Sequence, residues 1–568
     1  MEQASDETVK PQIQLPLRKR QAVMGAVMMG LFLGALDQSV VGTALPKIVT
    51  DLHGNNLYTW VVTSYLLTST ITVPIYGKLS DMYGRKVLLL VGIVLFLAGS
   101  ALSGLSQSMT ELVLFRGLQG FGAGALFPIS LSIIGDIFTP RERGRYQGLF
   151  GAVFGLSFVI GPFIGGWITD NITWHWVFYV NLPIGLAALA VIAAVLPNFH
   201  PPVRSSIRDL DILGILVFAG GVVPLMIGLT DKGQTTSSGA LLNWTDPSVG
   251  GLILLGLVLL AVFVFIESRA KQPIIPLSLF RGRTFAAVNT AIFLISFGMF
   301  AAIIFLPRYY QGVRGISATE SGYLVWPLLV GLMGASIGAG ILTSRMGRYK
   351  KLVTVAMVVF IIGSYFMTHI QAGTSNWLLW AWMLVMGAGI GPSMSVFTVA
   401  VQSEAPPAQL GVATSTLTFI RQIGGSVGLA ISGTLFSQTF NQKLPGSLLS
   451  HGIPVSVAHH LSSGAGAVTG SSLTGVGLGS QLGHVLPAKL HPLIPKLVAA
   501  IHDAFAQSIG VVFWLPVAAG IVAFIAVLVM PDVKLRGQAR GSAEAANTIP
   551  GAEIPDDHIL AEEEAAAR

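Results

Sequence analysis

One acidic residue, Asp37, lies about midway along the first long apolar run of the sequence, within residues 35–48 (ALDQSVVGTALPKI). An ionised carboxylate in a hydrocarbon environment costs several kcal/mol unless it is paired or protonated. Acids that persist in such segments generally carry protons or bind cations. We therefore predict that Asp37 accepts a proton, and that Gln38 beside it contributes to the polar lining of the same interior.

Two arginines, Arg116 and Arg421, also fall within apolar runs. A deprotonated Asp37 would need a positive partner, and Arg116 is the best candidate for that role. Alternatively, Arg116 binds helix-end carbonyls or extends its side chain toward the membrane surface. Arg421 and its neighbour Gln422 either line the interior or tie two helices together. Gln119, in the same run as Arg116, is a further candidate for the lining.

The stretch at residues 77–86, GKLSDMYGRK, places charges and glycines between two apolar runs. Its glycines allow a tight turn and close helix approach, while its charges suit helix ends. The simplest alternative is that the basic residues only orient the chain in the membrane. The acid among them, and an echo of the stretch at residues 340–348, favour an ion-paired gate instead. The expected gate residues are Gly77, Asp81, Gly84, Arg85 and Lys86, with Asp136 and Arg143 as partners on the same side of the membrane.

Another apolar run contains Gly161, Pro162, Gly165 and Gly166. Proline removes an amide donor and kinks a helix, and glycines four residues apart let a second helix pack closely. A helix of this kind at the contact between two halves of a protein can act as a hinge and a seal. Ordinary packing of membrane helices is the alternative.

Helices that cross a membrane must position these residues. The chain has 568 residues, of which 52% are hydrophobic and 10% charged, against about 25% charged in an ordinary soluble domain. Its 66 glycines suit the close contacts of membrane helices. We predict an all-α polytopic membrane protein. Its partner is the lipid bilayer and not nucleic acid, because its basic residues are dispersed in short loops.

The sequence lacks the residues that several kinds of catalytic or binding site require. It has no cysteine, which excludes disulfides, thiolate metal sites and cysteine nucleophiles. Its 11 histidines include no pair four residues apart that flanks an acid, so we expect no metal site. The pattern GxxxxGK[ST] does not occur, so we expect no nucleotide-binding loop. The chain is therefore expected to be neither an enzyme nor dependent on a cofactor.

Apolar runs of about 20 residues, the length of a membrane-spanning helix, recur along the chain. The echo of residues 77–85 in residues 340–348, each preceded by a Leu-Pro pair (Leu45-Pro46 and Leu306-Pro307), indicates two related six-helix halves. We predict fourteen spans, at residues 21–43, 58–77, 87–106, 112–134, 146–169, 177–197, 211–231, 249–269, 284–311, 320–343, 352–371, 376–399, 410–436 and 508–531.

The predicted organisation follows from these spans. Residues 1–20 form a cytoplasmic segment, 21–197 the first half, 198–283 a linker with two extra spans, 284–531 the second half, and 532–568 a disordered cytoplasmic tail. A long extracellular loop, residues 437–507, interrupts the second half. Most of the 33 Lys and Arg residues then lie on the side of the N-terminus, which predicts that both termini are cytoplasmic. Compact loops and the lack of an organellar signal suggest a bacterial cell membrane.

The motifs, taken in order, resemble those of one transporter family. Residues 77–86 look like the signature loop of the major facilitator superfamily. Residues 36–46 (LDQSVVGTALP) and 174–185 (WHWVFYVNLPIG) are similar to motifs of its fourteen-span drug:proton antiporters, although Gly42 and His175 depart from the commoner asparagine and arginine. Residues 115–120 (FRGLQG) resemble a fourth-helix motif whose arginine is implicated in proton coupling. Residues 151–166 resemble the fifth-helix motif that marks antiporters.

The resemblance covers residues 21 to about 436 and the last span, and it implies a major facilitator fold. It further implies a monomeric, proton-coupled multidrug efflux antiporter that exports amphipathic, cationic compounds by alternating access and so supports antibiotic resistance. Three alternatives stay open. These are export of one endogenous solute such as a lipid, siderophore or amino acid; uptake by uniport or proton symport; and a non-transporting receptor or scaffold that uses the 437–507 loop.

Overall fold

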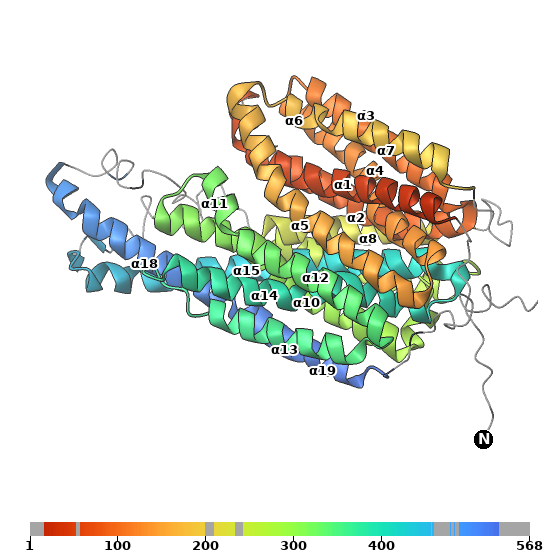
Figure 1. Ribbon diagram of the computed structural model, residues 1–568. Helices are drawn as coiled ribbons and strands as arrows, with labels where there is room; N and C mark the ends of the chain where they lie inside the picture. Colours follow the sequence, from red (N-terminus) through yellow and green to blue (C-terminus); the bar gives the residue numbers. More distant parts are fainter. Residues whose placement is uncertain are drawn as a thin grey trace, which may run out of the picture.

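The computed structural model describes residues 16–52, 57–198, 210–232, 242–455, 457–458, 478, 482, 488–532 and 535. These residues form an all-helical bundle without β-strands, which confirms the predicted fold class (Figure 1). Within them, twelve helical segments are long and apolar enough to cross a membrane. The other two predicted spans correspond to α2 and α15, which are 26 and 41 residues long but more polar. The total of fourteen spans therefore stays a prediction.

The first half of the chain forms one group of helices (Figure 1, red to yellow-orange). Gly84 separates its second and third helices with a φ of 96°, which glycine adopts without steric cost. Thr139 and Glu142 form a capping box where the fifth helix begins. Both turns follow an even-numbered helix, so they lie at the same end of the bundle. The helices are α1 (Leu17–Asp51), α2 (Tyr58–Tyr83), α3 (Arg85–Leu105), α4 (Met109–Ile137), α5 (Pro140–Asn171), α6 (Trp176–Tyr179) and α7 (Asn181–Val195).

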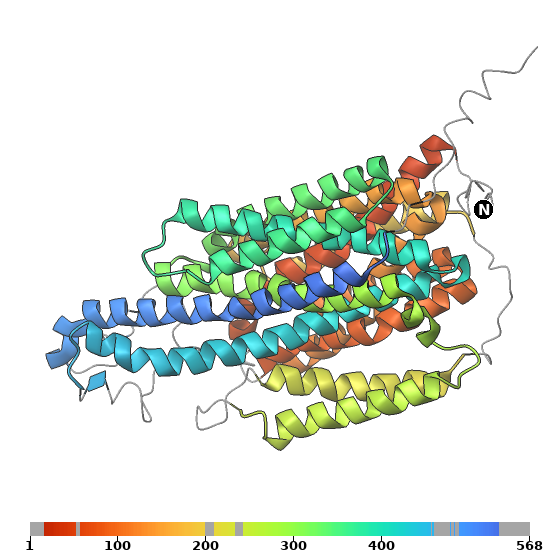
Figure 2. The same cartoon turned by 90° about the horizontal axis from the view of Figure 1, so that it is seen from below.

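Two inserted helices, α8 (Ile212–Asp231) and α9 (Leu252–Glu267), pack against each other along one side of the bundle (Figure 2, yellow). A short helical turn, η3 (Pro247–Gly251), directly precedes α9, and a second one, η4 (Leu277–Arg281), comes after it. The surface of α9 is mostly exposed and apolar, as expected of a helix that faces lipid. This pair matches the two extra spans predicted between the halves.

The second half repeats the arrangement of the first, and its fifth major helix, α15, is extended to 41 residues. Its elements are α10 (Arg283–Arg314), α11 (Ala318–Leu324), α12 (Trp326–Met346), α13 (Lys350–Met367), α14 (Asn376–Glu404), η5 (Pro407–Gln409), α15 (Leu410–Ser450), η6 (Ala488–Leu493), α18 (Ile494–Val512) and α19 (Trp514–Val529). The predicted last span begins inside α18 and continues through α19, because a break at Phe513 divides the segment.

The predicted 437–507 loop is wrong at both of its ends. Helix α15 continues to Ser450, and α18 begins at Ile494, so the two helices form a hairpin that projects past the rest of the bundle (Figure 2, cyan and blue). Leu444 and Leu448 are buried one turn apart on α15, and the Ser447 hydroxyl donates to the Ala500 carbonyl of α18 at 2.8 Å. Most of the segment between residues 456 and 487 lies outside the described residues, as do residues 1–15 and 536–568 of the terminal segments predicted at 1–20 and 532–568.

Glycines let the two halves touch backbone to backbone at one end of the bundle. A Cβ at Gly77 of α2 would overlap Ser415 of α15, and a Cβ at Gly340 of α12 would overlap the Gly144 carbonyl of α5. Gly77 and Gly340 are the first residues of the repeated stretch. Each lies on the second major helix of its own half and packs against the fifth helix of the other half. This exchange shows that the sequence repeat is a structural repeat.

Candidate functional site

Polar side chains from two helices of the first half, α4 and α7, contact Asp37 on α1. Its side chain on α1 has no exposed surface, and Oδ2 lies 2.7 Å from Nη1 of Arg116 on α4. The Gln119 amide donates to Asp37 Oδ1 at 2.9 Å, and the Asn181 amide at the start of α7 donates to the same oxygen at 3.0 Å. These four residues are termed the Asp37 cluster.

Arg116 makes several further contacts, all with residues of the first half. Its Nη1 also donates to Gln119 Oε1 at 2.7 Å, its Nε donates to the Val61 carbonyl at 3.4 Å, and its guanidinium lies 4.2 Å from the centre of the Tyr65 ring. Only 2% of the residue is exposed. The predicted pairing with Asp37 is therefore confirmed, and in this structure Arg116 does not extend toward the membrane surface.

The hydrogen bonds of the Asp37 cluster make the position of Arg116 depend on the charge of Asp37. Three N–H groups donate to Asp37, one from the Arg116 guanidinium and two from side-chain amides. A change in the charge of Asp37 would act on Arg116 and on both amides through these bonds. Because the partners belong to α1, α4 and α7, such a change alters contacts among three helices at once.

Two members of this network were not among the predicted site residues. Asn181 also donates to the Ser100 hydroxyl at 3.1 Å, and Ser100 in turn donates to the Phe178 carbonyl at 2.9 Å. Both are neutral polar residues in apolar runs, and the sequence does not indicate whether such a side chain faces the interior or the lipid. The one available signal was the family-like motif at residues 174–185, which contains Asn181.

The glycines of α5 divide between two neighbours. Gly161 packs on Ser39, and Gly165 packs on Thr43, so the predicted motif contacts α1 within its own half, one turn from Asp37. The Ser39 hydroxyl donates to the α5 carbonyl of Ser157 at 2.9 Å. Pro162 faces α11 of the second half, and Gly166 is buried.

The seal between the halves comes from an earlier part of α5 than predicted. Gly144, Gly148 and Gly151 pack directly on α12 of the second half. They recur at intervals of three and four residues, which places them on one face of the helix. The hinge role of residues 161–166 stays a prediction, and their closest glycine contacts lie inside the first half.

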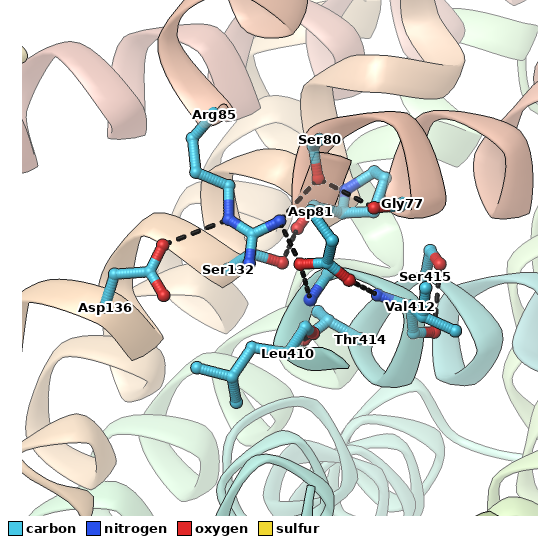
Figure 3. A network of polar contacts seen from close by, with 12 residues as sticks. Gly77, Ser80, Asp81, Arg85, Ser132, Asp136, Leu410, Val412, Thr414 and Ser415 are labelled. Atoms are coloured by element: carbon cyan, nitrogen blue, oxygen red, sulfur yellow. Dashed lines mark hydrogen bonds and ion pairs between the residues drawn. The ribbon is translucent and has the colours of Figure 1, made fainter. Parts of the chain in front are cut away.

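An ion-paired cluster joins the halves where α2 meets α15 (Figure 3). Arg85 lies between Asp81, with Nη1 2.5 Å from Oδ1, and Asp136, with Nε 3.0 Å from Oδ2. The Asp81 carboxylate also accepts the backbone amides of Gly411 at 2.9 Å and Val412 at 2.8 Å. It thereby caps the N-terminus of a helix in the other half, where the helix dipole favours a negative charge. Asp81, Arg85, Asp136 and this first turn of α15 are termed the latch.

A second layer supports the latch without charge pairing. Arg143 donates to the carbonyls of Gly135 at 2.6 Å, Phe138 at 3.0 Å and Gln402 at 3.2 Å, and the last of these belongs to the second half. The Gln147 amide donates to Gln402 Oε1 at 2.7 Å. Of the two predicted partners of the 77–86 stretch, Asp136 binds Arg85 directly, whereas Arg143 donates to backbone carbonyls outside that stretch.

The remaining predicted residues lie apart from these clusters. Lys86 donates to the Ala193 carbonyl of α7 at 2.6 Å and does not join the latch. Gln38 is half-buried beside Asp37, and Gln422 is half-buried with its Oε1 enclosed and unpartnered. Arg421 is buried in α15. In the described part of the chain, no group of three or more His, Cys, Asp or Glu side chains is arranged to hold a metal ion.

Comparisons with known proteins agree with this architecture. The structure is similar to that of the proton:xylose symporter XylE, with a TM-score of 0.56 over 91% of this chain and 97% of that one, at 14% sequence identity. A likeness at that identity concerns the fold alone.

Sequence relatives are closer. The multidrug transporter protein MdtP of Bacillus subtilis is 41% identical over 419 residues, which cover 74% of this chain and 76% of that protein. Multidrug resistance protein 3 of the same organism is 33% identical over 534 residues, which cover 93% and 99%. The family model of the Major Facilitator Superfamily matches residues 27–429. The chain therefore belongs to the Major Facilitator Superfamily and is a multi-pass membrane transporter.

Proposed function

We propose that the protein is a proton-coupled multidrug antiporter that exports amphipathic compounds, organic cations among them, by alternating access. The observation that carries the proposal is the Asp37 cluster, in which a buried acid and a buried arginine pair with each other. Relatives named as multidrug transporters support the efflux direction. The proton gradient supplies the free energy without a cofactor, and the chain works as a monomer in a bacterial cell membrane.

In the proposed cycle, Asp37 exchanges a proton between the two sides of the membrane. With the latch closed, the predicted cytoplasmic end is sealed, so Asp37 receives its proton from the outside and substrate leaves. Protonation frees Arg116 from its partner and shifts the contacts among α1, α4 and α7. In the inward-facing state the latch is open, Asp37 releases the proton to the cytoplasm, and the negative charge that remains favours entry of the next cation.

The latch supplies the second state that alternating access requires. Its ion pairs lie within the first half, and its cap on α15 exists only while the halves meet at this end. Opening must expose Arg85 and both acids to water, which solvates them in place of the lost contacts. The closed and open states can therefore lie close in free energy, as a transporter that cycles between them needs.

The test is transport of ethidium, a fluorescent organic cation, in proteoliposomes under an imposed pH gradient. We expect the intact chain to exchange protons for ethidium and Asp37→Asn to lose this exchange. Asp51→Asn is the matched control, because Asp51 is also on α1 but is partly exposed and pairs with Lys47 near the surface. Full efflux by Asp37→Asn would refute the proposed role of Asp37. If the intact chain moves neither ethidium nor protons, export of one specific solute becomes the better hypothesis.

A further inference from the structure

A buried arginine in the second half has no partner. Arg421 on α15 is 8% exposed, and its Nε and Nη2 atoms are enclosed without a hydrogen-bond acceptor among the described residues. No ion pair to Arg421 occurs in that part of the chain either. Arginine stays protonated in proteins, so it cannot escape this situation by losing its charge.

The acids that could neutralise Arg421 are occupied elsewhere. Asp37 is bound by Arg116 and two amides. In the second half, Glu320 caps α11, Glu404 accepts the Phe285 amide, and Asp503 pairs with His451. Arg421 therefore has neither a counter-charge nor, at Nε and Nη2, a hydrogen-bond acceptor among the described residues. Burial of an unpaired charge is costly, so a partner that the protein itself does not supply is expected.

The position of Arg421 directs it to the space between the halves. Thr414, Thr418 and Arg421 recur at intervals of four and three residues and share one face of α15. Thr414 accepts the Gln402 amide on this face, and Gln402 also donates to the Leu131 carbonyl of α4 in the first half. The face is therefore turned toward the other half. Arg421 lies about two helical turns, or about 10 Å, beyond Thr414 and away from the latch.

Helix α10 packs along α15 at the level of Arg421. Gly425 of α15 packs against the ring of Phe300 on α10, and Gly424 packs on the backbone of Phe293. Asn289, one turn before Phe293, is buried with its Oδ1 unpartnered, although its amide donates to a carbonyl of its own helix. Phe300 therefore lies one turn from Arg421, whereas Asn289 and Phe293 share a pocket with Phe419, Ile420 and Ile423 on another face of α15.

We propose that Arg421 binds the carboxylate of amphipathic aromatic acids while their ring systems pack on the α10 aromatics. A guanidinium presents paired N–H donors in a fork that matches the two oxygens of a carboxylate. The inference deepens the proposed function, on which it rests, because it adds compounds with an anionic group to the expected substrates. The first half then carries the proton site, and the second half recognises the acidic group of the cargo.

The test compares a ligand with its uncharged twin on the purified full-length chain. The probes are dansyl-phenylalanine and its methyl ester, which differ only in the carboxylate, and binding is followed by fluorescence titration. We expect the wild-type chain to bind the acid about ten- to a hundredfold more tightly than the ester. Arg421→Gln should remove this preference and leave the affinity for the ester unchanged, and Arg421→Lys should retain part of it.

Control variants and a separate assay keep the outcomes distinct. Arg348→Gln removes a half-exposed arginine that pairs with Asp532, and it should leave the preference intact. Equal affinity of the wild-type chain for both probes, no binding of either, or equal weakening of both in Arg421→Gln would overturn the proposal. If Arg421→Gln fails to fold, the wild-type preference and Arg421→Lys still decide it. Ethidium itself has no carboxylate, so failure of proton–ethidium exchange would refute the proposed function separately.

Discussion

The two halves of the molecule each bury an arginine in a membrane-spanning helix, but only one of these arginines has a partner. Arg116 is bound by Asp37, Gln119 and a backbone carbonyl, whereas Arg421 has no acceptor among the described residues. The halves share their helix order and their exchanged glycine contacts. The duplicated scaffold is therefore shared while the buried charges differ: Arg116 is paired within its own half, and the proposed partner of Arg421 is a ligand.

The largest effect is expected from removing Arg116, the arginine that has a partner. Arg116→Gln leaves Asp37 buried without a counter-charge, so we expect a loss of about 3–5 kcal/mol in unfolding free energy. Thermal unfolding in detergent measures it. The double variant Asp37→Asn/Arg116→Gln removes both charges and should recover most of the loss. A single variant as stable as the wild type would mean that Asp37 does not depend on Arg116.

A third buried arginine, Arg85, tests whether pairing also controls conformation. Asp81→Ala removes one of its two acids and the cap of α15, which should shift the closed–open balance by about 1–2 kcal/mol, or about tenfold, toward the open state. The chain has no cysteine, so a single cysteine at Thr418 can report the change through its maleimide labelling rate. An unchanged rate would show that the latch does not hold the closed state.

The unpartnered arginine should respond in the opposite direction from Arg116. Arg421→Gln removes a charge that nothing compensates, so we expect stability to stay level or to rise by on the order of 1 kcal/mol. The same unfolding assay, run without added ligand, makes the two arginines directly comparable. A large loss of stability in Arg421→Gln would indicate a structural tie and would remove the contrast between the halves.

The smallest effect is expected at Lys86, next to Arg85 in the sequence. Its amine binds a carbonyl at the end of α7, within the first half and away from α15. Lys86→Ala should therefore change stability by less than about 0.5 kcal/mol and leave labelling at Thr418 unchanged. Faster labelling in this variant would place Lys86 in the gate, as the sequence motif predicts.

Charged residues in apolar runs were the part of the site that sequence could predict. Asp37 and Arg116 stand out because each is costly alone, and their pairing follows from that cost. Asn181 and Ser100 carry no such signal, since neutral polar residues occur in many membrane helices for packing alone. The cap that Asp81 places on α15 could not be predicted either. It joins Asp81 to Gly411, 330 positions later in the chain, and so depends on how the two halves pack together.

The fold was predictable where apolarity alone defines a helix. The spans, the inserted pair and the duplicated halves all followed from length and repetition. The extension of α15 to Ser450 did not, because its outer part alternates Gln, Asn, Lys and Gly with a narrow stripe of apolar residues. That stripe is buried against α18, a partner that lies beyond a long intervening segment.

The projecting hairpin of α15 and α18 has a practical consequence for imaging. A 59.9 kDa transporter that lies mostly within a detergent micelle presents few features by which single particles can be aligned. A helical pair that is packed along its length and extends past the bundle gives the particle an unambiguous direction. It is also a natural epitope for an antibody fragment, which would add mass at a site remote from the Asp37 cluster and from Arg421.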